Sequence, residues 1–212
     1  MNKEAFFTEV RKGILGPTLS PDEVSGCEAI MDAMAGLPRS WCAYALGTAY
    51  LETAHSMQPV IEANWLSPSA RERYFTRMYD ITGHRPKKAR ELGNTTPGDG
   101  AKYPGRGYPQ MTGKGNYEKA TAKLKAMGHD VDLVANPALA MRPDIAALIM
   151  RFGMVEGWFT GKGFADYLPY SGGATLKTYM PARRIINGMD RAADVASAAM
   201  SFDAALAKGG WA

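Results

Sequence analysis

The sequence predicts a mainly α-helical protein that is interrupted by one long ordered loop. Apolar residues recur at helical spacing over most of the chain, in windows that include 3–12, 69–80, 116–127, 143–158 and 190–207. Glycine and proline gather instead in residues 93–115, which hold seven glycines and three prolines in 23 positions. A loop of this length inside a compact domain is usually functional, and this one has room for a short hairpin. With no repeat and no low-complexity linker, we expect a single domain over 1–212.

Composition places the chain among globular proteins. Its 212 residues can bury a sizeable core, and 46% hydrophobic with 22% charged residues is unlike a disordered chain. No apolar run approaches the roughly 20 residues of a membrane span, so no stable membrane insertion is expected. The first residues mix charged with apolar side chains, unlike a secretory signal peptide. We therefore expect synthesis in the cytoplasm, with any release by another route.

The chain is mildly basic. Lys and Arg number 25 against 21 Asp and Glu, and the pI is about 9.0. This excess favours anionic partners such as nucleic acid, a membrane surface or an acidic wall polymer, without choosing among them. One local cluster is either a solvated face or a surface that attracts an anionic polymer; it consists of His84, Arg85, Lys87, Lys88 and Arg90.

Neither cysteine nor histidine suggests a metal or a disulfide framework. Cys27 and Cys42 both fall in apolar helical patterns, which predicts buried free thiols. The three histidines lie far apart, and the sequence has no CxxC or HExxH motif. We therefore expect no zinc site and no cofactor.

Two helix starts can be predicted from capping residues. Ser20 stands before Pro21 and three residues ahead of Glu23, the pattern of a capped helix with proline at its first position. Ser40, directly before Trp41, is the second predicted N-cap.

The helix that starts at Ser40 carries the first candidate catalytic residue, Glu52. Eleven residues at about 100° each bring Glu52 to within about 20° of the face on which Trp41 lies. A glutamate at the end of an apolar stripe is partly desolvated, which favours the protonated form that a general acid needs. Alternatively, Glu52 is a solvated helix-end residue or a partner of His55.

Glu62 is the second candidate carboxylate. Pro59 cannot continue a helix and biases Gln58 away from helical angles, so we expect the helix to end at about residues 57–58. Glu62 then lies on the segment beyond, where it can turn back towards Glu52. Two carboxylates across a cleft are the minimum apparatus for glycoside hydrolysis. The alternative is that Glu62 is a surface charge.

The loop sequence GRGYPQMTGKGNY does not fit a phosphate-binding loop. Five residues separate Gly107 from Gly113 where that motif has four, and Gly115 stands where Ser or Thr should follow the lysine. We expect no nucleic-acid partner. Neutral hydrogen-bonding groups near aromatics suit sugar hydroxyls and N-acetyl groups instead, and this segment offers Tyr103, Gln110, Thr112 and Asn116.

Several motifs in order resemble one known enzyme family. The segment GDGAKYPGRGYPQMTGKGNY resembles the Y-x-G-R-G-x-x-Q-[LM]-[ST]-x-x-x-N-Y element of family 19 glycoside hydrolases, and ARRIING resembles their later R-x-I-N-G element. The stretches PTLSPDEVSGCEAIMDAM and NPALAMRPDIAALIMRFGMVEGWFTG look like the version in phage endolysins and related bacterial muramidases. The resemblance covers nearly the whole chain.

The resemblance implies a lysozyme-like fold, mainly α and bilobed, with a substrate cleft between two lobes. It maps the general acid to Glu52, the base to Glu62, and the hydroxyl that helps hold the attacking water to Thr112. Positions that match sugar-binding or cleft-side residues are Gln110, Asn116, Arg184 and Asn187.

Two departures favour the branch that cleaves peptidoglycan. Plant-type chitinases have a histidine directly before the acid, whereas here Leu51 precedes Glu52, and the gap between the carboxylates is shorter. We therefore expect a monomeric endolysin that cuts between N-acetylmuramic acid and N-acetylglucosamine in bacterial peptidoglycan. It would be made in the host bacterial cytoplasm and act on the wall from the periplasm after release. The alternatives are a chitinase and a non-catalytic glycan-binding domain.

Overall fold

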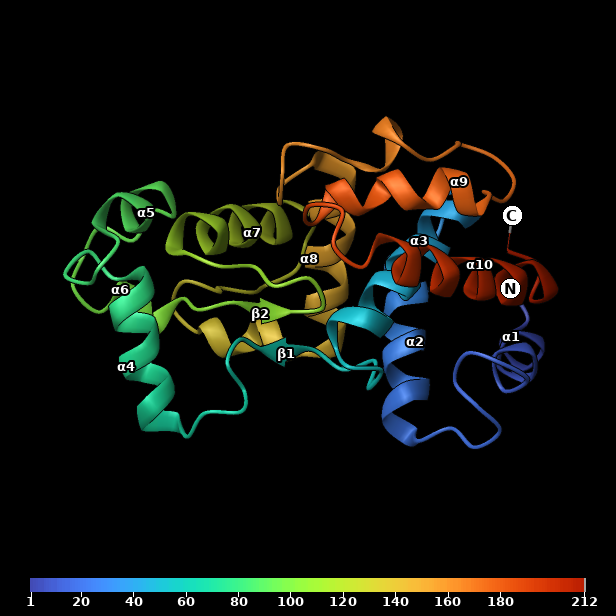
Figure 1. The fold of residues 1–212 in the computed structure, drawn as a ribbon, viewed down its shortest axis with the longest axis horizontal. Helices are drawn as coiled ribbons and strands as arrows, with labels where there is room; N and C mark the ends of the chain where they lie inside the picture. The colour runs from blue at the N-terminus through green and yellow to red at the C-terminus, as the bar shows by residue number, and fades with distance from the viewer. Residues whose placement is uncertain (212) are drawn as a thin grey trace. The chain divides into compact units, whose positions relative to one another are not determined.

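The computed structural model describes residues 1–211, and it confirms a mainly α protein (Figure 1). Over these residues the chain forms ten α-helices, three short 3-10 helices and one two-stranded sheet. It divides into two compact units: a first unit of Met1–Gln58 and Ala147–Ala212, and a second unit of Pro59–Ala146. Within the described part of the chain, no helix combines the length and the apolar character that a membrane crossing needs.

The first unit is built around helix α3 (Arg39–Glu52), which packs along α10 (Ala192–Lys208). Residues 40–49 of α3 are all buried, as expected of a helix that is covered on every side. The two backbones approach closely at Gly47, where an added Cβ would lie 2.7 Å from the amide nitrogen of Ala199. The other elements of this unit are α1 (Lys3–Val10), α2 (Pro21–Ala33), most of α8 (Pro143–Glu156), η2 (Phe164–Asp166), α9 (Leu176–Tyr179) and η3 (Met180–Ile185).

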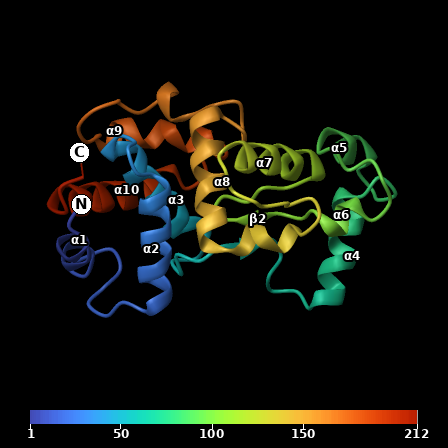
Figure 2. The same ribbon diagram turned by 180° about the vertical axis from the view of Figure 1, so that it is seen from behind.

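Helix α8 runs beside α2 (Figure 2), and an arginine joins the two. Arg151 of α8 donates from Nη1 to the carbonyl oxygens of Ala33 and Ala35, at the C-terminal end of α2. Carbonyl groups at the C-terminal end of a helix have no donor within the helix, and they carry partial negative charge. A cationic donor such as the Arg151 guanidinium is therefore a favourable partner for them.

The capping prediction is confirmed for α2 and wrong for α3. Ser20 accepts from the Glu23 amide, and Glu23 reaches back to the Ser20 amide. Helix α3 starts at Arg39 after Pro38, and its N-cap makes no side-chain bond. Ser40 is fully buried, and its hydroxyl donates to the Pro169 carbonyl at 3.0 Å. A buried hydroxyl needs a partner, and for Ser40 a distant loop supplies it.

Helix α3 ends at Glu52, about five residues before the predicted end. The Thr53 hydroxyl donates to the Ala49 carbonyl at 2.8 Å and accepts from the Met57 amide at 3.0 Å. Ala54 and His55 then take positive φ values of 49° and 73°, which cannot continue a right-handed helix. A left-handed turn therefore closes the helix before Pro59 can act.

The second unit contains the only strands among the described residues. Strand β1 (Val60–Ile61) pairs antiparallel with β2 (Arg106–Gly107), with Val60 opposite Gly107. The predicted loop 93–115 contains β2 and also a short helix, α6 (Asp99–Lys102), which the sequence did not predict. A bridge between Arg106 and Met111 closes a small hairpin inside it. The remaining elements are α4 (Pro68–Tyr79), α5 (Pro86–Glu91), α7 (Lys114–Ala126) and η1 (Pro137–Met141).

Both cysteines are buried free thiols, as predicted. Burial raises the pKa of the Cys27 and Cys42 thiols far above the ordinary range, so both stay protonated and behave as small apolar side chains.

The turn after α3 is docked on α2. A Cβ at Gly26 of α2 would lie 1.8 Å from the Met57 carbonyl oxygen, so only glycine admits this backbone contact. Gln58 Nε2 adds hydrogen bonds to the Asp22 carbonyl at 2.6 Å and to Ser25 Oγ at 3.1 Å. Helix α2 therefore holds the segment directly after Glu52.

We predict that Gly26→Ala lowers the free energy of unfolding by about 1–3 kcal/mol, because the new methyl group must push the Met57 backbone away from α2. Urea unfolding measures the change. Gly13→Ala is the matched control, since a Cβ at exposed Gly13 meets nothing within 4 Å. Equal stabilities of the two variants would contradict the close contact.

Candidate active site

Unusual backbone conformations cluster between the two candidate carboxylates. Five non-glycine residues among 1–211 have positive φ, and four of them are Ala54, His55, Met57 and Ala63. Each such residue costs about 1–2 kcal/mol and persists only where its surroundings hold it. Strain of this kind is concentrated at functional sites, which directs attention to the segment from Glu52 to Ala63.

Glu52 forms an ion pair with a buried arginine. Arg183 Nη1 lies 2.6 Å from Glu52 Oε1, and the Arg183 side chain is only 6% exposed. Arg183 Nε also donates to the Asp190 carbonyl at 2.9 Å, so the guanidinium is fixed at two points. The Glu52 side chain is 28% exposed. One oxygen is therefore held by a rigid cation while the group keeps access to solvent.

A buried tyrosine lies close to the Glu52 and Arg183 side chains. Tyr44, about two helical turns before Glu52 on α3, is fully buried and stacks on Tyr179 with ring centroids 6.1 Å apart. Burial raises the pKa of the Tyr44 hydroxyl far above its usual value, and the nearby Arg183 charge only partly opposes this. Tyr44 thus stays neutral and adds no charge beside Arg183 and Glu52.

Glu62 is held by a tyrosine and by the strand pairing. Tyr79, at the end of α4, donates its hydroxyl to Glu62 Oε1 at 2.8 Å. The Glu62 amide donates to the Gly105 carbonyl at 2.9 Å, next to the β1–β2 pairs. Burial, with the bond to Glu62, raises the pKa of Tyr79 far above its usual value. Tyr79 therefore remains a hydrogen-bond donor, and the other carboxylate oxygen is left for a different partner.

Three sequence-predicted side chains converge at Gly105. A Cβ built on Gly105 would lie 2.8 Å from Gln110 Oε1 and 3.0 Å from both Glu62 Oε2 and Thr112 Oγ1. A side chain here would displace all three oxygens. Within the second unit, a carboxylate, a hydroxyl and an amide oxygen therefore lie around Gly105, because this residue has no side chain.

Other predicted residues support the loop that carries Thr112. Asn116 Nδ2 donates to the Thr112 carbonyl at 2.7 Å. Tyr103 is 1% exposed, its hydroxyl donates to the Val134 carbonyl, and its own carbonyl accepts from the Gly113 amide. The Tyr103 side chain therefore packs inside the second unit, and the Asn116 amide nitrogen positions Thr112.

The late element ARRIING contributes Arg183 to the Glu52 ion pair, rather than the predicted Arg184. Arg184 and Asn187 lie outside this pair: Thr160 donates to the Arg184 carbonyl, and Asn187 Oδ1 accepts from the Gly188 amide. Sequence reasoning missed Arg183, because adjacent residues of a helical turn face different directions and the sequence does not say which arginine of the doublet faces inward. It also missed Tyr79, for which no sequence motif gave a sign, and the role of Gly105, although Gly105 is the first glycine of the Y-x-G-R-G element.

Buried Asp80 ties the end of α4 to the loop. Its carboxylate accepts from the Thr82 amide and hydroxyl, and from the amides of Gly98 and Gly100. Asn94, also buried, donates to the Tyr79 carbonyl and accepts from the Lys114 amide. The donor to Glu62 and the loop that carries Thr112 thus share one hydrogen-bonded frame.

Comparison with known proteins gives no assignment. No protein-family model matches the chain, and no curated protein matches it significantly. The function must therefore be argued from the site itself and from the motifs in the sequence.

The Asp80 frame predicts a pH-dependent stability. Although burial by itself raises the pKa of the Asp80 carboxyl, the bonds from Thr82, Gly98 and Gly100 lower it below the usual value. A depressed folded-state pKa adds stability above the unfolded value of about 3.9, and this is lost as pH falls through the folded pKa. We predict that Asp80→Asn is destabilised at pH 7 and that the gap to wild type narrows as pH falls below about 4.

Urea unfolding at neutral pH and at two acidic pH values, on either side of the unfolded pKa, measures this gap. Asp130→Asn, at an exposed position of the same unit, serves as the control and should track wild type at each pH. A gap for Asp80→Asn that stays constant over this range would contradict the role given to its carboxylate.

Proposed function

We propose that the protein is a peptidoglycan hydrolase of the family 19-like endolysin type, which cuts the bond between N-acetylmuramic acid and N-acetylglucosamine. The observation that carries this proposal is the convergence of Glu62 Oε2, Thr112 Oγ1 and Gln110 Oε1 at Gly105. A carboxylate can take a proton from a water molecule, and a hydroxyl beside it can hold that water in place by a hydrogen bond. Gln110 and Thr112 belong to the motif that resembles family 19 glycoside hydrolases, and the resemblance maps the second carboxylate to Glu62.

In this proposal Glu52 is the general acid. Arg183 engages Oε1, so the transferable proton is carried by Oε2 and passes to the glycosidic oxygen as the bond breaks. A protonated Glu52 can still accept from Arg183 through its carbonyl oxygen while its hydroxyl donates, so the Arg183 contact is kept in the acid form and becomes an ion pair only when Glu52 is ionised. Arg183 then stabilises the carboxylate that remains after proton transfer.

Glu62 is the proposed base. Tyr79 fixes one of its oxygens, and the other takes a proton from a water that Thr112 also contacts. Water attacks the face of the sugar opposite to the leaving group, so the product is inverted, which requires carboxyl groups about 6.5–9.5 Å apart. A lysozyme-like bilobed arrangement with a cleft, with Glu52 and Glu62 acting on one bond, belongs to the same proposal. The chemistry needs no cofactor.

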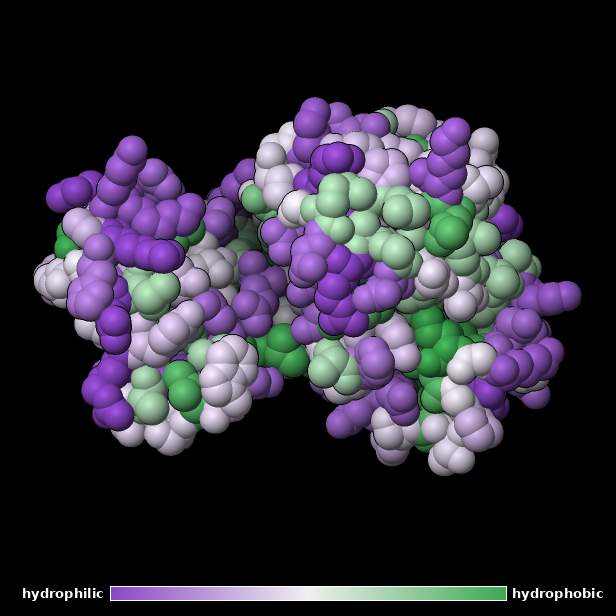
Figure 3. All heavy atoms as spheres, viewed as in Figure 1, coloured by the Kyte–Doolittle hydropathy of each residue, from purple (hydrophilic) through white to green (hydrophobic). Residues whose placement is uncertain are grey.

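Charge supports an anionic wall polymer as substrate. The second unit holds 14 Lys and Arg against nine Asp and Glu, whereas the rest of the chain holds 11 and 12. Figure 3 shows hydrophilic side chains gathered over α5, where Arg85, Lys87, Lys88 and Arg90 are all exposed. The basic excess therefore belongs to the unit that carries Glu62 and Thr112, and it speeds encounter with an anionic polymer at low salt.

A chitinase is the second candidate, because the same carboxylates and amides accept polymers of N-acetylglucosamine. The missing histidine before Glu52 favours peptidoglycan over chitin. A non-catalytic glycan-binding domain has no need for a carboxylate held by a buried arginine, or for a second one poised beside a hydroxyl.

The first test of this function is Glu52→Gln. The amide keeps the shape and the Arg183 contact through its oxygen but has no proton to transfer. Hydrolysis of purified peptidoglycan should fall by at least the roughly 10²–10⁴ of a general acid, and the protein should still fold. Near wild-type hydrolysis by a folded Glu52→Gln protein would remove Glu52 from the mechanism.

Gly105→Ala tests the convergence of the three oxygens. Its methyl group must displace Gln110, Glu62 and Thr112, and misplacement of catalytic groups by about 1 Å can cost 10²-fold in rate. Gly115→Ala is the matched control, because its Cβ meets no atom closer than 3.4 Å. We expect a loss of about 10²-fold for Gly105→Ala alone; equal rates for the two variants would contradict the arrangement.

A double-mutant cycle tests whether Glu62 and Thr112 act on one water. Glu62→Gln and Thr112→Ala should each slow hydrolysis, and the double variant should lose much less than the product of the two losses. NMR of early product from the β-linked substrate should show the α-anomer first. Fully multiplicative losses, or early β-anomer, would rule out the shared water.

A further inference from the structure

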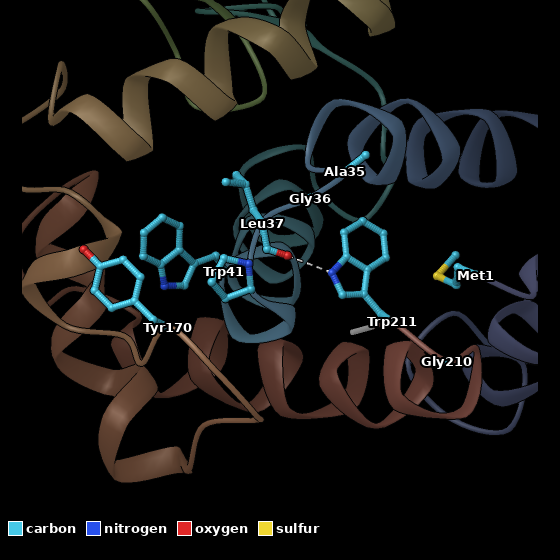
Figure 4. A pocket seen from close by; sticks show the side chains of 9 residues that line it. Met1, Ala35, Gly36, Leu37, Trp41, Tyr170, Gly210 and Trp211 are labelled. Carbon is cyan, nitrogen blue, oxygen red and sulfur yellow. Dashed lines mark hydrogen bonds between the residues drawn. The ribbon is translucent and has the colours of Figure 1, made fainter.

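An aromatic groove lies in the first unit, at the N-terminal end of α3. Its volume is about 710 Å³, and the residues that line it are Met1, Ala35, Gly36, Leu37, Pro38, Trp41, Tyr170, Gly210 and Trp211. Figure 4 shows Trp41 between Tyr170 and Leu37, with Trp211 on the other side of Leu37. Trp41 and Glu52 stand eleven residues apart on the same helix, about 16 Å along its axis. The groove is therefore separate from the ion pair of Glu52 and Arg183.

The rings of this groove are held in place, and one of them, that of Tyr170, is largely exposed to solvent. Tyr170 is 70% exposed, and its ring packs on Trp41 with centroids 5.1 Å apart. Trp41 in turn stacks on buried Phe164, also at 5.1 Å. Across the groove, Trp211 is fixed by a bond from Nε1 to the Leu37 carbonyl at 2.9 Å. An exposed aromatic that is immobilised by its neighbours loses little entropy when a ligand stacks on it, so it is a pre-formed binding surface.

One polar atom of the groove is unsatisfied. Trp41 is 5% exposed, and no acceptor for its Nε1–H exists among residues 1–211. Figure 4 shows this nitrogen on the edge of the indole that faces Tyr170. A buried donor without a partner costs free energy. Because Tyr170 covers this nitrogen, a ligand with an acceptor oxygen recovers that cost only where the exposed Tyr170 ring moves aside.

The lining also restricts the charge of a ligand. No lining side chain within the described range is acidic or basic, so the side chains of the groove offer no counter-charge to a phosphate or a carboxylate. A neutral ligand with flat apolar faces and acceptor oxygens fits this surface. N-acetylated hexopyranose rings have these properties, because their C–H faces stack on aromatic rings and their hydroxyl and acetamido oxygens accept hydrogen bonds.

We propose that this groove is a second binding site for the glycan strand, one that takes neutral N-acetylhexosamine units away from the catalytic residues. The proposal rests on the proposed glycan hydrolysis only for the identity of the polymer. Stacking on Tyr170 and Trp211 would hold the enzyme on an insoluble glycan between cleavage events, which lowers the apparent KM on that substrate and leaves the chemical step unchanged.

The full-length Glu52→Gln protein provides the first test, because it does not consume the ligand. Its four tryptophans give four indole N–H signals in an NMR spectrum of ¹⁵N-labelled protein. Titration with the β-1,4-linked N-acetylglucosamine tetramer should shift the signals of Trp41 and Trp211, and Tyr170→Ala should weaken that binding by about tenfold. Leu176→Ala, at an exposed apolar position of the same unit, should leave it unchanged.

The second test uses the active enzyme. Tyr170→Ala and Trp211→Leu should raise KM on insoluble peptidoglycan and leave kcat, and turnover of a short soluble fragment, as in wild type. Failure of the wild-type protein to hydrolyse any glycan would sink the proposed function but not the tetramer titration, so the two ideas fail separately.

Three outcomes would overturn the second site. The first is that the tetramer leaves the Trp41 and Trp211 signals unmoved at millimolar concentration. The second is that those signals shift with protein concentration together with dimerisation in light scattering, which would assign the groove to a second copy of the chain. The third is that anionic lipid vesicles shift them where the tetramer does not, which would assign it to a membrane.

Discussion

The hydroxyl of Thr53 fixes where helix α3 stops, and the candidate acid depends on that point. The Thr53 hydroxyl gives the Ala49 carbonyl a second donor besides the Thr53 amide, and it accepts from the buried Met57 amide, which closes the turn. Glu52 is consequently the last residue of an otherwise buried helix. There its carboxylate reaches Arg183 while it keeps a path to solvent.

The turn also explains how a strained segment persists. Ala54, His55 and Met57 would each prefer negative φ, and the Met57 backbone remains in place because α2 offers a glycine at the contact point. The second unit solves a similar problem in another way. There the side-chain oxygens of Asp80 and Asn94 accept hydrogen bonds from loop amides. Gly105 has no side chain, which leaves room for the oxygens of Glu62, Thr112 and Gln110 to lie around it. In both units, contacts of the backbone position the polar side chains, and the face of a helix on which a residue lies does not.

Periodicity and local capping signals predicted the mainly helical fold, the capping box at Ser20 and the two buried thiols, because each depends on residues close together in the chain. The motif that resembles family 19 hydrolases also selected Gln110 and Thr112, and the position of Glu62 after Pro59 suggested the second carboxylate; the three oxygens lie around Gly105. Sequence reasoning failed for the end of α3, because the turn depends on the Thr53 hydroxyl and on a tertiary contact between Met57 and Gly26, whereas the prediction relied on Pro59. It failed for Arg183 and Tyr79 because only the fold decides which arginine of a doublet is buried and which tyrosine meets a carboxylate.

The most direct measurement of the proposed hydrolysis is the identity of the new chain ends in digested peptidoglycan. Purified peptidoglycan is digested with wild-type protein, reduced with borohydride and analysed by mass spectrometry. Acid/base hydrolysis between N-acetylmuramic acid and N-acetylglucosamine predicts muropeptides with intact peptide stems and a reduced muramic acid at the new end. Reduced N-acetylglucosamine ends, anhydro-muramic ends that borohydride leaves unchanged, or free peptide stems would each contradict this mechanism.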